Sequence, residues 1–96
     1  YKMNLDIRNP EQVISDSNEL IALASRIEGE ISNLQAQKTK IEANWTSNTT
    51  DRDSTVAGLT KNISNLTALV AGIRKVANDA SYYAERSIEI SRNQIN

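Results

Sequence analysis

The hydrophobic residues of the chain form two series in which the spacing alternates between three and four positions. Eight of the ten positions in the first series are apolar, against 39% of all residues. All nine positions of the second series are apolar. The first series is Val13, Ser17, Leu20, Ala24, Ile27, Ile31, Leu34, Lys38, Ile41 and Trp45, and the second is Val56, Leu59, Ile63, Leu66, Val70, Ile73, Ala77, Ala80 and Ala84. This spacing is typical of α-helices that pack along one side, so we expect two long helices and call these positions the seam.

Residues before the first series and between the two series predict where the helices begin. Asn9 is a favourable N-cap residue, and Pro10 suits the first helical position. Between the series the chain reads "TSNTTDRD", in which Thr50 is the expected second N-cap. We predict one domain over residues 1–96, with helix one at about 10–46, the turn at about 47–50 and helix two at about 51–92.

A short connection requires the two helices to run antiparallel, so the residue numbers of facing positions should sum to a constant. With a sum of 97, every seam position except Trp45 faces a seam position of the other helix, and Trp45 faces Arg52. The facing pairs include Ile41 with Val56, Leu34 with Ile63, Ile27 with Val70 and Leu20 with Ala77. The fold class predicted is therefore all-α, an antiparallel two-helix hairpin.

Further apolar residues flank the seam where the two chain termini should meet. They are Ile14, Ile21 and Leu23 on helix one, and Leu69, Val76 and Tyr83 on helix two. Two helices bury only one stripe each, so a second hairpin would cover this surface. We expect the hairpin to dimerise into a four-helix bundle, with itself or with a homologous hairpin protein. The alternative is that these residues only widen the core face.

Trp45, the only tryptophan, ends the first series at the edge of the most polar segment. It is expected to close the turn end of the hairpin, with its indole N–H donating to a loop carbonyl and its ring against Arg52 or Val56. A ligand-stacking role is the alternative.

The composition excludes several classes of function. The chain has no Cys and no His, which removes the usual general base, the thiolate nucleophile and the commonest metal ligands. We therefore expect no enzyme, no catalytic residues, no cofactor and no metal site. Eleven basic residues against 12 acidic ones do not favour nucleic-acid binding. The longest apolar run, Leu20–Ala24, is far too short for a membrane span, and the first residues lack the apolar stretch of a signal peptide.

A 96-residue hairpin with Trp at the middle turn resembles the WXG family of ESAT-like proteins. Members of this family are exported by the type VII (ESX) secretion systems of Gram-positive and mycobacterial organisms and are associated with virulence. The turn of the family reads Trp-x-Gly, and the corresponding residues here are Trp45, Thr46 and Ser47, with Ser in place of Gly. The resemblance implies secretion without a cleavable signal peptide, from a cytoplasmic precursor, as a substrate or as an export adaptor.

The family also carries a C-terminal export signal, Tyr-x-x-x-Asp/Glu. In this chain Tyr82 is followed by Glu85 at the third position and by Arg86 at the fourth. By resemblance, Tyr82, Glu85 and Ile88 form the candidate export segment. A type VII secretion ATPase or a larger effector would then be a further partner.

A second interpretation uses the seam alone. The chain would be a structural coiled-coil module, or a fragment of a larger helical protein, with no role in secretion. Heptads that continue in a longer parent gene would favour this interpretation.

Overall fold

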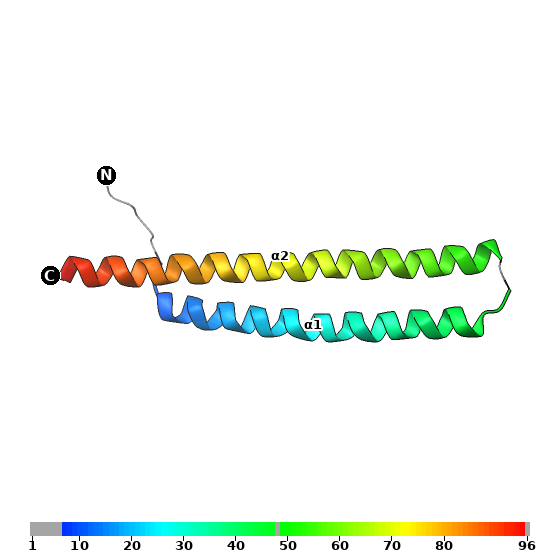
Figure 1. Ribbon diagram of the computed structural model, residues 1–96. Helices are drawn as coiled ribbons and strands as arrows, with labels where there is room; N and C mark the ends of the chain where they lie inside the picture. Colours follow the sequence, from blue (N-terminus) through cyan, green and yellow to red (C-terminus); the bar gives the residue numbers. More distant parts are fainter. Residues whose placement is uncertain (1–6, 48, 96) are drawn as a thin grey trace. The chain divides into compact units, whose positions relative to one another are not determined.

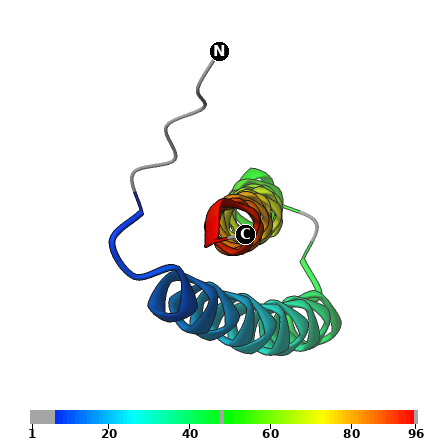
Figure 2. The same cartoon turned by 90° about the vertical axis from the view of Figure 1, so that its left-hand side faces the viewer.

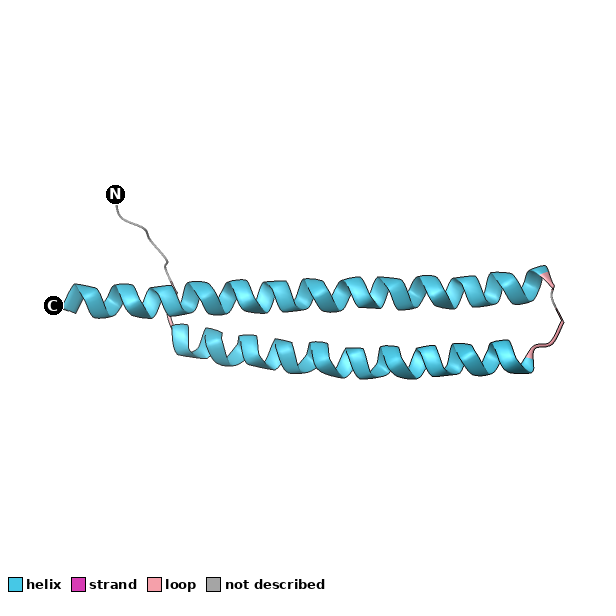
Figure 3. Ribbon diagram, viewed as in Figure 1, coloured by secondary structure: helices cyan, strands magenta, loops and turns pink. Residues whose placement is uncertain are grey.

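The computed structural model describes residues 7–47 and 49–95, and in this part of the chain every regular element is an α-helix (Figures 1 and 3). Helix α1 comprises Pro10–Asn44 and helix α2 comprises Thr50–Ile95. The predicted all-α fold is confirmed. Helix α1 ends two residues before the expected position 46, and α2 continues three residues beyond the expected position 92. The predicted domain and turn also include residues 1–6, Asn48 and Asn96, which lie outside the described residues.

Helix α1 begins at the N-cap that the sequence predicts. The Gln12 backbone N–H donates to Asn9 Oδ1 at 3.1 Å, and the Val13 N–H donates to the Asn9 carbonyl, also at 3.1 Å. The first bond satisfies an N–H group that the first turn of a helix leaves without a partner, and the second is the first regular hydrogen bond of the helix. The Gln12 side chain donates forward to Asp16 Oδ1 at 2.9 Å. The cap is therefore formed by Asn9 and Pro10 at the positions expected from their conformational preferences.

Helix α2 is capped by Thr49, one residue before the Thr50 that we predicted. The Arg52 N–H donates to Thr49 Oγ1 at 3.3 Å, and the Asp53 N–H donates to the Thr49 carbonyl at 3.1 Å. Thr50 is the first helical residue. Asp51 and Asp53 both lie in the first turn, where the positive end of the helix dipole favours acidic side chains.

The chain divides into two compact units, each built from one segment of α1 and one of α2. The second unit is the continuous stretch Ala24–Ala71, a helical hairpin in which the turn joins the end of α1 to the start of α2 (Figure 1). The first unit combines the described parts of Tyr1–Leu23 and Gly72–Asn96. Its two segments lie antiparallel and side by side in both the side view and the end view (Figures 1 and 2).

The core of the second unit follows the predicted seam. All of the seam positions within Ala24–Ala71 are buried or half-buried, and the most buried are Ala24, Ile31, Ile63 and Val70. Lys38, one of two polar seam residues in the first series, is half-buried. Its aliphatic stem can cover neighbouring apolar surface while the ammonium group stays in water.

The core of the first unit is built from smaller side chains. Its fully or almost fully buried residues are Ser17, Ala77 and Ala84. The Ser17 hydroxyl donates to the Val13 carbonyl at 2.8 Å, so this polar seam residue is buried with its hydrogen bond made. Small side chains remove little apolar area from water. The fully buried positions of the first unit therefore contribute less apolar area than Ile31, Ile63 and Val70 contribute to the second unit.

Candidate interaction sites

Most of the large exposed hydrophobic residues of the described chain belong to the first unit. Leu23, Val76, Tyr82 and Tyr83 are 44–59% exposed, although each lies within a helix that packs on its other side. A fifth, Leu69, is 51% exposed and belongs to the second unit. Scattered exposed apolar residues are ordinary, but a group concentrated in one small unit marks a surface for a partner.

The structure separates the predicted dimer residues by exposure. Ile14 and Ile21 are half-buried, whereas Leu23, Val76 and Tyr83 are exposed. The heptad accounts for this difference.

Ile14 and Ile21 each follow a seam position by one residue, while Leu23, Val76 and Tyr83 each precede one. In an antiparallel helix pair, these two kinds of position lie on opposite edges of the seam. We call the edge that carries Leu23, Val76 and Tyr83 the exposed edge of the first unit. The dimer surface predicted from the sequence includes Ile14 and Ile21 together with these residues and does not distinguish the two edges.

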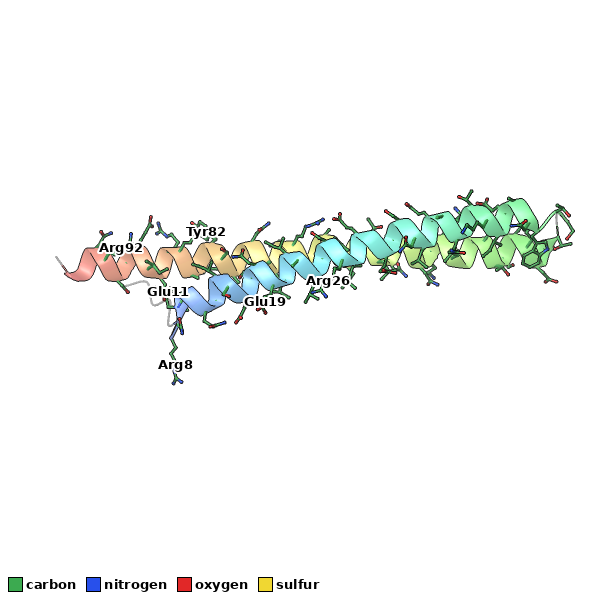
Figure 4. The ribbon with its side chains drawn as sticks, turned by 90° about the horizontal axis from the view of Figure 1, so that it is seen from below. Arg8, Glu11, Glu19, Arg26, Tyr82 and Arg92 are labelled. Carbon is green, nitrogen blue, oxygen red and sulfur yellow. The ribbon has the colours of Figure 1, made fainter. Side chains whose placement is uncertain are left out.

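The two adjacent tyrosines contact each other on α2. Their ring centroids are 5.3 Å apart with an interplanar angle of 76°, an edge-to-face arrangement that aromatic rings favour. Tyr82 projects from α2 clear of the α1 segment (Figure 4). The pair therefore presents two rings in edge-to-face contact beside the exposed edge.

The candidate export residues are only partly brought together. Tyr82 and Glu85 line a shallow hollow of about 280 Å³ together with Arg86 and Glu89. Ile88 does not line this hollow and is half-buried instead. The export segment predicted by resemblance does not include Arg86 and Glu89. Their side chains form an ion pair at 3.8 Å. Their spacing of three along a helix is the signal that could have identified this pair.

The turn residues Trp45, Thr46 and Ser47 line a second hollow, of about 470 Å³, with Ile41 and Asn44. Trp45 is half-buried and directly follows the end of α1. The sequence predicts that its indole N–H bonds a loop carbonyl and that its ring packs against Arg52 or Val56. Arg52 does contact Trp45, through the backbone: Arg52 Nε donates to the Trp45 carbonyl at 2.8 Å.

Lys75 and Asp79 form an exposed ion pair on the α2 segment that carries Val76. Lys75 Nζ lies 2.7 Å from Asp79 Oδ2. The hydrogen bond to Asp79, and then its negative charge, raise the pKa of Lys75 above its ordinary value. Lys75 is therefore protonated at neutral pH, and it lies beside the exposed edge.

Within residues 7–47 and 49–95, no three acidic side chains are grouped so that they could hold a metal ion. In the same part of the chain, neither helix contains a stretch long and apolar enough to cross a membrane. No protein-family model, curated protein or solved structure matches the chain.

Proposed function

We propose that the protein is a helical-hairpin interaction protein of the WXG type, exported by a type VII secretion system as a substrate or as an export adaptor. It acts through protein–protein contacts. The observation that carries this proposal is the composition of the first unit, which buries small residues at its core and exposes Leu23, Val76, Tyr82 and Tyr83. Such a surface is typical of a helical unit completed by a partner.

The turn supports the WXG assignment. Trp45 stands immediately after α1 and before the cap of α2, which is the place that the resemblance gives to the family tryptophan. Ser47 replaces the family glycine. Among the described residues none has a positive φ angle, so Ser47 does not adopt the conformation for which glycine is favoured. The replacement is therefore compatible with the turn that this chain forms.

The export segment differs from the family signal in its spacing. Tyr82 and Glu85 share one hollow on the surface of α2, and we propose that the secretion ATPase contacts the chain there. The acid lies three residues after the tyrosine, one fewer than in the family signal, and Arg86 occupies the fourth position. Any recognition of this segment would therefore involve a cation where the family has a carboxylate.

The partner proposed for the exposed edge is a second copy of this chain, or a homologous hairpin. A second hairpin would bury Leu23, Val76 and Tyr83 in a four-helix bundle, the arrangement in which amphipathic helical pairs cover their remaining apolar surface.

A secretion assay tests the export role. The tagged chain would be produced in a Gram-positive host with an active type VII system and in the same host without its secretion ATPase. Export predicts the chain in the medium of the first culture alone. Tyr82→Ala and Glu85→Ala should reduce secretion, whereas Glu19→Ala, which removes an exposed carboxylate from α1, should not (Figure 4). Equal amounts in both media, or no release from either host, would contradict the proposal.

The second candidate function, a structural coiled-coil module, is favoured by the regularity of the seam. All nineteen seam positions of the two series are buried or half-buried, without a break in the three-four spacing. A module of this kind would show the same helices and the same exposed edge. It would remain inside the cell in both hosts of the secretion assay.

A further inference from the structure

The C-terminal end of α1 lacks the glycine that commonly caps an α-helix. The last carbonyl groups of any α-helix have no partners within that helix, and a glycine in the left-handed conformation commonly supplies the missing contacts. The residues that follow α1 begin with Trp45, Thr46 and Ser47, and none of them is glycine. No residue in the described ranges has a positive φ angle. The Ile41 carbonyl accepts from the Trp45 N–H at 2.9 Å, so it is the carbonyls after Ile41 that need a donor group from outside α1.

That group is the guanidinium of Arg52, from the first turn of α2. Arg52 Nε donates to the Trp45 carbonyl at 2.8 Å, and Arg52 Nη2 donates to the Glu42 carbonyl at 3.1 Å. The Arg52 side chain is only 20% exposed, so its charge is held close to the turn. A planar guanidinium can donate to two acceptors at once from nitrogens in a fixed geometry.

The charges around Arg52 alternate in sign. The C-terminal end of α1 is the negative end of its dipole, and a cation stabilises it. Arg52 Nη1 also lies 3.7 Å from Asp53 Oδ1, a carboxylate at the positive N-terminal end of α2. One side chain therefore connects the end of the first helix with the acidic start of the second.

We propose that Arg52 is the positioning residue of this turn: it closes α1 in place of a left-handed glycine and, by holding the Trp45 carbonyl, fixes the orientation of the Trp45 side chain. The hollow lined by Trp45, Thr46 and Ser47 then has a defined shape because its backbone is held at Glu42 and Trp45. This inference concerns the second unit alone and does not depend on the export role.

Trp45 is the only tryptophan, so its fluorescence reports on the turn without interference from other indoles. The experiment compares Arg52→Met with Arg26→Met, a matched control that removes an exposed arginine from the α1 segment of the same unit (Figure 4). Emission wavelength and acrylamide quenching are measured at low temperature, where far-ultraviolet circular dichroism establishes that the helices are intact.

Arg52→Met should shift the Trp45 emission to the red and raise its quenching towards the value of the unfolded chain. Its melting temperature should fall by roughly 4–8 °C relative to Arg26→Met, the shift that losing a pair of turn contacts gives in a chain of this size. Loss of general helix stability without release of the turn would lower the melting temperature but leave the quenching at low temperature unchanged. Equal quenching in the two variants would overturn the proposal.

Arg52→Lys provides a second comparison if Arg52→Met loses its helical signal. Lysine keeps the charge, but its three donors share one nitrogen and cannot reproduce the separated Nε and Nη2 contacts. Its quenching should lie between those of the unmodified chain and the unfolded chain. Quenching identical to that of the unmodified chain would show that charge alone holds the turn, which would overturn the assignment of the two-carbonyl contact.

Discussion

Two neighbouring threonines allow a sharp test of how α2 begins. In the structure Thr49 caps the helix through its hydroxyl, and Thr50 is the first helical residue. Replacing an N-cap threonine by alanine typically costs about 0.5–2 kcal/mol. The Thr49 Oγ1 to Arg52 N distance of 3.3 Å is long and the bond is exposed, so Thr49→Ala should lie near the middle of that range, at about 1 kcal/mol.

The same substitution one residue later should have the opposite sign. Thr50 occupies a helical position, where alanine is the better helix former by at most about 0.7 kcal/mol. Thermal unfolding followed by circular dichroism should show a melting temperature about 4–8 °C lower for Thr49→Ala and unchanged or slightly higher for Thr50→Ala. A larger loss for Thr50→Ala than for Thr49→Ala would refute the assigned cap and restore the boundary expected from the sequence.

Three further predictions concern the helices and the turn. Gly58 is exposed within α2, and a methyl group there would meet no atom within 4 Å apart from its chain neighbours and the nearby backbone of its own helix. Gly58→Ala should therefore stabilise the chain by about 0.5–1 kcal/mol in urea unfolding. Destabilisation would indicate that another surface approaches the helix there. Trp45→Gly should lower stability by roughly 1–2 kcal/mol, because Trp45 is only half-buried, and an unchanged melting curve would contradict its role in closing the turn. Because the folded pKa of Lys75 is raised above 10.5, its contribution to stability is complete below that pH and is lost as pH rises through the folded value. Asp79→Asn should remove this part of the alkaline pH dependence, and an identical alkaline profile for Asp79→Asn would argue against the pair.

The sequence predicted the helices and the seam because both follow from side-chain periodicity. Apolar residues spaced alternately three and four positions apart lie on one side of an α-helix, independently of the rest of the fold. The start of α1 could also be predicted from Asn9 and Pro10, because asparagine favours the N-cap position and proline favours the first helical position. The second cap was wrong by one position because Thr49 and Thr50 have the same side chain, and only the backbone path distinguishes them.

The turn contacts could not be predicted in the same way. Arg52 reaches carbonyl groups seven and ten residues earlier in the chain, and its position depends on the path of the turn. Composition gave no reason to expect a contact at the Trp45 carbonyl. The exposed edge was partly predictable: heptad positions distinguish Ile14 and Ile21 from Leu23 and Val76, but only the structure shows that the former are half-buried.

The central proposal is that a second copy of the chain, rather than a homologous hairpin, covers the exposed edge of the first unit. Light scattering of the purified protein over a range of concentrations tests it directly, because one chain has a mass of 10.6 kDa. We predict a mass twice that of one chain, persisting at low micromolar concentration. Val76→Glu should reduce it to that of one chain, because Val76 is the most exposed large hydrophobic residue of the edge. Ala57→Glu, at an exposed position of the second unit, should leave it unchanged. The mass of one chain at every concentration, or a dimer that Val76→Glu does not weaken, would contradict the claim.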